Sequence, residues 1–288
     1  MNPVSRSSTL AEQIRAAALR LGDRNEAARL AALALDQPLG WIFAHGDEPL
    51  DPRLVHRFAE MVDRRAQGVP FAYIAGRREF FGRDFSVSPS VLIPRPETEH
   101  LVEWSLELPL SDDARVLDVG TGSGCIILSL AAERTGWRCT ATDISKEALA
   151  VAAINRERLQ LPQVRFLQGN LLEPIDETGF DLVVSNPPYV AAEDPHLEDG
   201  DIRFEPEIAL ASSLDGLGHI RNLVESARSV LANGGWLLIE HGYDQAEAVR
   251  RLLRDHGYEN IASRRDLAGI ERVTGGCRRD NEQEHKQA

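Results

Sequence analysis

The chain has 288 residues, of which 43% are hydrophobic and 6% aromatic, a composition typical of a globular protein with a sizeable core. Its formal net charge of −13 is the wrong sign for an enzyme whose affinity comes from neutralising the phosphates of duplex DNA. That charge weighs against a free-standing DNA enzyme and is compatible with a basic protein partner. The cysteines Cys125, Cys139 and Cys277 show no metal-ligand spacing and no disulfide framework, so no metal site is expected.

No apolar run approaches the roughly 20 residues that span a bilayer. The first residues, MNPVSRSSTLAEQ, also lack the apolar core of a signal peptide. Together with the cysteine usage, these features predict a cytoplasmic protein with no membrane contact. A monomer is the default expectation.

Helical signals dominate the first part of the chain. Residues 9–12 have the pattern of a capping box, and residues 26–35 form a second apolar-periodic stretch. Asp51 is a plausible N-cap for a helix over 52–67, because Pro52 suits the first helical position. These signals predict a small helical domain over residues 1–75.

A short extended segment follows. Residues 73–93 are rich in Phe, Val and Gly, with alternation in FSVSPSVLI and turn signals at Gly76, Gly82 and Ser88-Pro89. A β-hairpin linker is therefore predicted over 76–93. Prolines in IPRPETEH mark its end, and a helical pattern restarts at Glu97.

From Ser111 onward, strands and helices alternate. The expected strands are ARVLDV, RCTATD, VRFLQG, FDLVVS and GWLLIEH, separated by helical stretches and followed by a closing strand pair. This α/β alternation predicts a parallel sheet with helices on both faces, in a catalytic domain over 94–277. The polar remainder, 278–288, is predicted to be a disordered tail.

A glycine-rich turn leaves the first of these strands. Its spacing is GxGxG, preceded by an aspartate, rather than the GxGxxG of dinucleotide sites. A carboxylate beside such a turn suits a ligand that carries an ammonium and a sulfonium, so the turn predicts an S-adenosylmethionine site. The expected cofactor-binding residues here are Asp118, Gly120, Thr121, Gly122, Ser123 and Gly124.

Asp143 ends the next strand, about 20 residues after the turn, where a carboxylate accepts hydrogen bonds from both ribose hydroxyls. Without Asp143, the glycines alone would be compatible with a simple tight turn between a strand and a helix. Asp118 also has a structural alternative, as a buried partner of the helix dipole.

The sequence Asn186-Pro187-Pro188-Tyr189 follows the strand FDLVVS, at the edge where an open sheet binds ligands. Two prolines remove two amide donors, so backbone carbonyls and the Asn186 side-chain carbonyl remain to accept hydrogen bonds from an NH2 group. This arrangement orients a conjugated nitrogen toward a methyl donor, and Tyr189 is placed to stack on the planar group. Asn186, Pro187 and Tyr189 are the expected catalytic residues, and all four are the expected substrate-binding residues.

The tetrapeptide indicates the type of nitrogen rather than the polymer. It serves adenine-N6 and cytosine-N4 DNA methyltransferases, some ribosomal RNA methyltransferases and protein glutamine methyltransferases alike. In isolation it is also compatible with a rigid turn after a strand.

With these motifs in place, the sequence resembles the peptide chain release factor glutamine methyltransferases, the PrmC/HemK family. The resemblance covers nearly all of 71–276, in the segments YIAGRREFFGRDFSVSPSVLIPRPETE, DVGTGSG, ATDIS, NPPYV, EPEIAL, DGL, LLIEHGYDQ and ERVTGG. The combination of IPRPETE with NPPY is its most specific part. Residues 1–75 match in position and helical character more than in letters.

The resemblance implies a Rossmann-like, seven-stranded class I methyltransferase domain joined by a hairpin to a helical domain that binds the release factor. It implies S-adenosylmethionine as the cofactor and the glutamine of the GGQ tripeptide in release factors as the substrate. It also places Asn170 and Leu171 near the adenine and Asn186 close to the cofactor. The family often has Asp where this chain has Asn170.

Three other functions remain to be weighed. A nucleic-acid methyltransferase of the NPPY type would carry a target-recognition insertion or a basic surface, and the sequence shows neither. A non-catalytic scaffold would tolerate loss of NPPY, which is intact. A nicotinamide-dependent enzyme would need a different glycine spacing. Arg95 and Glu97 are expected either to pin the linker to the catalytic domain or to line the substrate channel.

Overall fold

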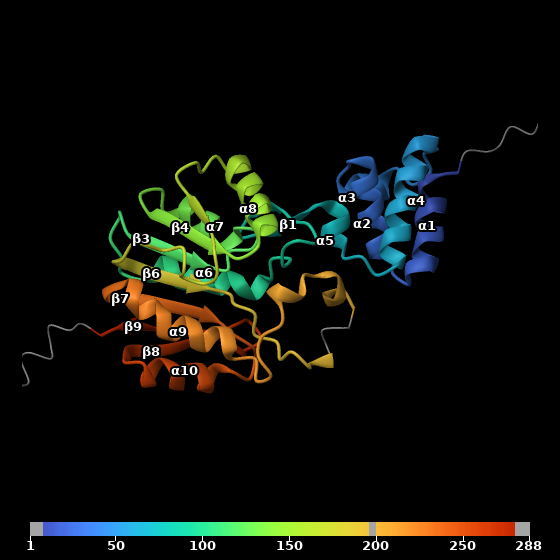
Figure 1. Cartoon of the computed structure of the whole chain (residues 1–288). Coiled ribbons are helices and arrows are strands. Elements are labelled where there is room, and N and C mark those ends of the chain that lie inside the picture. Colours follow the sequence, from blue (N-terminus) through green and yellow to red (C-terminus); the bar gives the residue numbers. More distant parts are fainter. Residues whose placement is uncertain (1–7, 196–199, 280–288) are drawn as a thin grey trace, which may run out of the picture. The chain divides into compact units, whose positions relative to one another are not determined.

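A computed structural model describes residues 8–195 and 200–279 (Figure 1). The chain forms two compact units, with the boundary between Gly76 and Arg77. The hairpin predicted as a separate linker is therefore grouped with the second unit. Arg278, which was predicted to lie in the tail, is instead the last residue of a strand. Residues 280–288 lie outside the described part of the chain, so the disorder of the tail stays a prediction.

The first unit is helical, as predicted. Its helices are α1 (Leu10–Leu21), α2 (Arg24–Leu35), α3 (Leu39–Ala44), α4 (Pro52–Ala66) and α5 (Phe71–Ala75). The capping box at Thr9 and Glu12 is confirmed, and Asp51 caps α4 by accepting a hydrogen bond from Arg53 N. Apolar faces of these helices share one core, which includes the fully buried Leu10 and Leu30.

Helix α5 corrects the prediction that the chain is extended from residue 73. Pro70 has an extended backbone just before the helix, and Gly76 ends it in the left-handed conformation. Ile74 is buried in the helical core, and Phe71 packs against that core one turn earlier. Burial of this one apolar face outweighs the β-propensity of the segment, because a helix of five residues is not stable on its own.

The second unit is built on strands that match the predicted segments closely. A two-stranded hairpin, β1 (Arg77–Phe80) and β2 (Arg83–Ser86), precedes a seven-stranded sheet in the order β5-β4-β3-β6-β7-β9-β8. The strands of the sheet are β3 (Arg115–Val119), β4 (Arg138–Asp143), β5 (Arg165–Gln168), β6 (Phe180–Ser185), β7 (Leu231–Glu240), β8 (Tyr258–Arg265) and β9 (Glu271–Arg278).

The sheet is mixed rather than wholly parallel. Strands β3 to β7 pair in parallel, whereas β9 pairs antiparallel with both β7 and β8. The short connection between β8 and β9 explains the difference, because a short turn can only join antiparallel strands. No helix within residues 8–195 and 200–279 is long and apolar enough to cross a bilayer.

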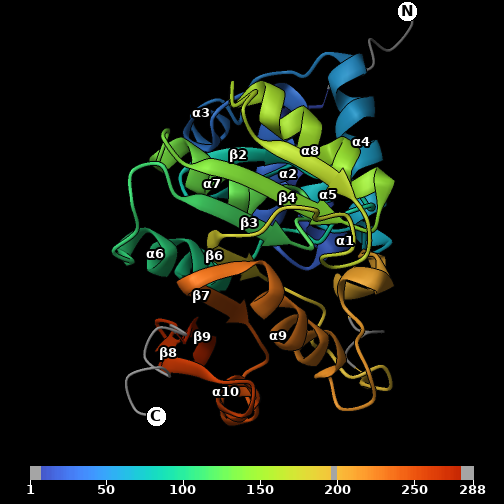
Figure 2. The same cartoon turned by 60° about the vertical axis from the view of Figure 1, so that its left-hand side comes forward.

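Helices cover both faces of the sheet, as the alternation predicted (Figure 2). Side chains of α6 (Glu99–Glu107) and α7 (Cys125–Glu133) pack with Val116 and Leu182 on one face. Side chains of α9 (Gly218–Val230) and α10 (Ala246–Asp255) pack with Leu117 and Val183 on the other. Helix α8 (Lys146–Arg158) lies beside α7, β4 and β5. Short 3-10 helices precede α6 (η1, Pro96–Thr98) and follow β6 (η3, Ile202–Phe204; η4, Glu207–Ala209).

Asn155 on α8 connects the hairpin to the glycine-rich turn. Its side-chain oxygen accepts a hydrogen bond from Ser86 N at 2.6 Å, and its Nδ2 donates to Ser86 O at 3.0 Å and Ser123 O at 2.9 Å. The side chain is buried, with 1% exposed. A buried amide with its partners satisfied is stabilising, whereas the same partners left alone are costly.

We expect Asn155→Ala to lower the free energy of unfolding by about 2–4 kcal/mol, because it leaves three buried or partly buried backbone groups without their partner. Chemical denaturation followed by circular dichroism would measure this loss. Glu157→Ala, at an exposed position of the same helix, is the matched control and should change stability by no more than about 0.5 kcal/mol. Equal effects of the two substitutions would contradict the role given to Asn155.

Candidate active site

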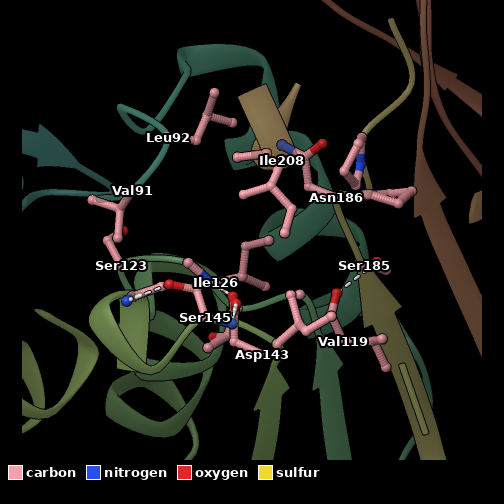
Figure 3. Close-up of a pocket in the computed structure, with 18 of the residues that line it drawn as sticks. Val91, Leu92, Val119, Ser123, Ile126, Asp143, Ser145, Ser185, Asn186 and Ile208 are labelled. Atoms are coloured by element: carbon pink, nitrogen blue, oxygen red, sulfur yellow. Dashed lines mark hydrogen bonds between the residues drawn. The ribbon is translucent and has the colours of Figure 1, made fainter. Parts of the chain in front are cut away.

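A cavity of about 190 Å³ opens at the carboxyl ends of strands β3, β4, β5 and β6. Its walls come from the turn after β3, the residues that follow the next three strands, and the chain just before η1. Figure 3 shows Asp143 and Ser145 on one side of this space and Asn186 and Ile208 on another. This edge of a parallel sheet is the usual ligand site of the architecture.

The turn after β3 depends on its glycines. Gly120, Gly122 and Gly124 have φ values of 75°, 57° and 80°, in the left-handed region that favours glycine. A side chain at Gly124 would also come within 2.9 Å of Leu128 Cδ1 on α7 and 3.3 Å of Ala152 Cβ on α8, so this glycine allows α7 to begin close to α8. The amides of Gly120 and Thr121 both donate to Thr142 O, which ties the turn to β4.

Asp118 lies fully buried beneath the turn. Its Oδ2 accepts a hydrogen bond from the Thr121 hydroxyl at 2.6 Å, while Oδ1 has no partner within the described residues. Burial raises the pKa of Asp118 to about 7, and the hydrogen bond from Thr121 only partly opposes that rise. A buried carboxylate with an unpaired oxygen suits a nearby cation, so its chemistry is compatible with a ligand that carries a positive charge.

Asp143 ends β4 at the opening of the cavity. Its Oδ2 accepts from Gly122 N at 2.8 Å and its Oδ1 from Ser145 N at 2.9 Å. Burial raises its pKa, and these amide donors lower it. A carboxylate has about four acceptor positions, so two remain for ligand hydroxyls. The two amides hold the side chain rigidly while leaving it able to bind a ribose.

The residues after β5 form the next part of the wall. Asn170 and Leu171 both line the cavity, and the Asn170 amide donates to Glu173 Oε1 at 3.2 Å. Leu171 has a φ of 48°, and its carbonyl accepts from the Thr142 hydroxyl at 2.9 Å, which fixes the loop against β4. The aliphatic side chains of Ile144 and Leu171 line this side of the cavity, and their apolar surface suits a flat ring.

Residues 186–189, the acceptor segment, follow β6. The Ser185 hydroxyl at the end of β6 donates a hydrogen bond to Val119 O on β3 at 2.7 Å, which ties the two strand ends together. Asn186, Pro187 and Pro188 line the cavity, and Asn186 Nδ2 donates to Thr98 Oγ1 at 3.2 Å. Tyr189 does not line it. Its hydroxyl instead lies 3.5 Å from Glu240 Oε1, and burial raises its pKa.

Most predicted site residues therefore surround one cavity, although their individual roles remain proposals. The cavity wall includes Gly120, Thr121, Gly122, Ser123, Asp143, Asn170, Leu171, Asn186, Pro187 and Pro188. Asp118, Gly124 and Tyr189 are not part of the wall. Tyr189 does not line the cavity, and its stacking role stays a prediction.

Several wall residues were not predicted. Val91 and Leu92 precede η1, Ile208 lies in η4, and Ile126 is on α7. Thr98 was within the IPRPETE segment that was recognised, but its role was not. No periodicity marks these positions, because they lie on loops and helix starts that only the tertiary fold brings together.

Arg95 both lines the cavity and pins its wall. Its guanidinium donates to Glu205 Oε1 at 2.5 Å, and Ile93 N donates to the other oxygen of the same carboxylate at 3.0 Å. The Glu205 side chain is completely buried. The segment before η1 is therefore held to the loop after β6 by one carboxylate. Arg95 thus both pins this segment and lines the cavity, which are the two alternatives expected for it.

Two protein families match the chain, the PrmC N-terminal domain over residues 11–76 and the Methyltransferase small domain over residues 98–199. Curated relatives match nearly the whole length. The release factor glutamine methyltransferase of Shewanella oneidensis is 42% identical over 93% of this chain and 96% of that relative. The one from Xylella fastidiosa strain Temecula1 is 47% identical over 91% of this chain and 95% of that relative.

Solved structures show the same fold at low identity. The hMettl16 catalytic domain in complex with the MAT2A 3′UTR hairpin 1 has a TM-score of 0.58 and 18% identity, over 82% of this chain and 85% of that chain. A methyltransferase from Pyrococcus furiosus has a TM-score of 0.54 and 19% identity, over 78% and 98%.

The mixed seven-stranded sheet, the glycine turn and the carboxylate at the end of β4 define a class I methyltransferase whose cofactor is S-adenosylmethionine. That cofactor supplies an electrophilic methyl group on a sulfonium. Identity above 40% across more than nine-tenths of the chain narrows the class further. The protein belongs to the release factor glutamine methyltransferase family.

Asp143→Ala should weaken S-adenosylmethionine binding by about 1–3 kcal/mol, because the ribose hydroxyls would lose their acceptors in a partly buried site. Isothermal titration calorimetry would measure the change in affinity. Lys146→Ala, exposed in the first turn of α8, is a nearby control that should leave affinity unaltered. An unchanged affinity in the Asp143 variant would remove this carboxylate from the ribose site.

The raised pKa of Asp118 predicts how the free energy of unfolding changes with pH. Because folding raises it from about 3.9 to about 7, the folded state binds the extra proton between these values. The contribution of Asp118 to stability is therefore full below pH 4 and is lost as the pH rises through 7. The stability of Asp118→Asn relative to the ligand-free wild type should then rise from pH 4 to pH 7. Denaturant unfolding across this range would test the trend, and a difference between the two proteins that is the same at pH 4 and pH 7 would contradict it.

Proposed function

We propose that this protein transfers the methyl group of S-adenosylmethionine to the side-chain amide nitrogen (N5) of the glutamine in the GGQ motif of peptide chain release factors. The observation that carries the proposal is the similarity to release factor glutamine methyltransferases over both units of the chain, at 42–47% identity for the relatives given above. The acceptor segment after β6 supports the same chemistry.

The glutamine amide is a weak nucleophile, because its nitrogen lone pair is delocalised into the carbonyl. The amide N–H groups need acceptors that hold the nitrogen toward the methyl donor while charge develops on it. The side-chain oxygen of Asn186 and the carbonyl of Pro187 are suited to accept these two hydrogen bonds. The nitrogen loses one proton as its bond to the methyl carbon forms, so positioning supplies most of the catalysis.

The helical unit is the proposed docking domain for the release factor. Residues 11–76 match the PrmC N-terminal domain, and this unit has its own core. We assign residues 1–75 to release factor binding, 76–93 to the hairpin, and 94–277 to catalysis. A cytoplasmic monomer that acts on a translation factor fits this assignment.

Methylation of a nucleic acid is not favoured. The solved structure with an RNA hairpin shares the fold at 18% identity, which indicates the architecture alone. The net charge of −13 also gives no general attraction to phosphates.

The proposal is tested by incubating the protein with radiolabelled S-adenosylmethionine and a purified bacterial release factor. We expect label on the release factor and none on its variant with the GGQ glutamine changed to alanine. Duplex DNA and ribosomal RNA serve as competing substrates. Label on either nucleic acid, or on none of the substrates, would overturn the proposal.

Asn186→Ala provides the control on the enzyme. It should reduce transfer more than about 100-fold, while affinity for the cofactor stays within about tenfold, because the lost oxygen belongs to the acceptor side. Equal losses in both would show that Asn186 belongs to the cofactor site instead.

A further inference from the structure

We propose that Gln245 and Gly216 hold the end of the acceptor segment in place, so that Asn186 and the Pro187 carbonyl keep the geometry that methyl transfer needs. Neither residue lines the cavity, so both are positioning residues that act through the acceptor segment. They come from two segments of the family resemblance, LLIEHGYDQ and DGL. The inference rests on the proposed function, because it concerns the same acceptor site.

Gln245 binds the last residue of the acceptor segment from the turn after β7. Its Nε2 donates to Tyr189 O at 3.1 Å, and its Oε1 accepts from Gly242 N at 2.9 Å. A backbone N–H can only donate and a backbone carbonyl can only accept, so these two partners decide which end of the Gln245 amide faces each of them. The donor toward Tyr189 is therefore fixed by backbone groups on both sides.

Gly216 lies directly against this hydrogen bond. It is buried and has a φ of 69°, and a Cβ atom at this position would come within 2.5 Å of both Tyr189 O and Gln245 Nε2. Nonbonded atoms cannot approach so closely, so any larger residue would force the chain at Tyr189 or the turn itself to move. Glycine allows the two segments to meet here.

The turn that carries this glycine is held by contacts of its own. Asp215 Oδ1 accepts from Leu217 N at 3.1 Å, and Arg221 Nη2 donates to Asp215 Oδ2 at 2.7 Å. Just before the turn, Ser212 N donates to Val190 O at 2.8 Å, which joins it to the residue that follows the acceptor segment. The turn is thus a firm support for the Tyr189 carbonyl.

The two prolines carry this support to the reacting groups. Their rings fix φ at Pro187 and Pro188, so the acceptor segment is stiff. At its other end, Asn186 Nδ2 donates to Thr98 Oγ1 at 3.2 Å. With both ends held, a displacement of the Tyr189 carbonyl also displaces the Pro187 carbonyl. A misplacement of about 1 Å can cost about 100-fold in rate, even when its cause lies away from the reacting atoms.

The first test is Gln245→Glu, which keeps the shape and an oxygen for Gly242 N but has no N–H to offer Tyr189 O. At about pH 8, where an ordinary glutamate is ionised, we expect kcat for transfer of labelled methyl to the release factor to fall about 10- to 100-fold. Affinity for S-adenosylmethionine, measured by calorimetry, should stay within about threefold of wild type.

This variant separates positioning from a purely structural role. If Gln245 only closed the turn at Gly242, the glutamate would do so equally well and kcat would equal that of wild type. That result, or a loss of cofactor affinity as large as the loss in kcat, would overturn the inference.

The second test compares Gly216→Ala with Gly234→Ala. Gly234 is an exposed residue of β7 with a φ of 75°, and no atom lies within 4 Å of the place that its Cβ would take. The two substitutions therefore share the backbone strain, and only the first meets Tyr189 O. We expect kcat to fall at least about tenfold further in Gly216→Ala, with cofactor affinity in both within about threefold of wild type. Equal values of kcat would contradict the role of Gly216.

These outcomes are distinct from failure of the proposed function. If the wild-type protein labels no release factor, the proposed substrate is wrong. If the wild type labels it and Gln245→Glu does so equally well, the substrate stands and the positioning role of Gln245 is wrong.

Discussion

The parallel pairing of β3 with β4 on one side and β6 on the other is the constraint on which the site depends. Because these strands run in the same direction, the residues that follow each of them emerge at one edge. The glycine turn lies about 20 residues before Asp143 and more than 60 before Asn186 in sequence, yet all three meet around one cavity. The Ser185 hydroxyl and the amides of the glycine turn then fix the strand ends to one another.

Two carboxyl groups at this edge, Asp118 at the end of β3 and Glu240 at the end of β7, are buried, and each has one oxygen without a partner among the described residues. Unpaired buried carboxylates are costly, and a stable fold has no reason of its own to keep them. Asp118 lies under the glycine turn and accepts from the Thr121 hydroxyl, whereas Glu240 ends β7 beside the hydroxyl of Tyr189.

Much of this arrangement could be predicted from the sequence. The strand segments were found because apolar runs bounded by glycine and proline have few alternative structures, and Asp143 was placed by its distance from the turn.

Other features were not predictable from local sequence. The alternation of strands and helices predicted a parallel sheet, whereas β9 runs antiparallel to both β7 and β8, and the direction of β9 is decided by these pairing partners. Helix α5 was missed because its stability comes from burial of Ile74 rather than from local propensity. Thr98 and Ile208 reach the cavity through tertiary contacts that leave no periodic signal. Tyr189 was expected to face the cavity, and its hydroxyl instead lies 3.5 Å from Glu240 Oε1.

Arg95 pairs with the carboxylate of Glu205, which lies 110 positions later in the chain. Protein synthesis proceeds from the N-terminus, so Arg95 and the loop before η1 leave the ribosome long before their partner exists. During that interval the first wall of the cavity has no buried anion to hold it. This wall of the cavity is therefore completed only when the chain beyond β6 has emerged. A nascent chain that stops earlier contains the glycine turn and Asp143 without the carboxylate that holds the segment before η1 in place.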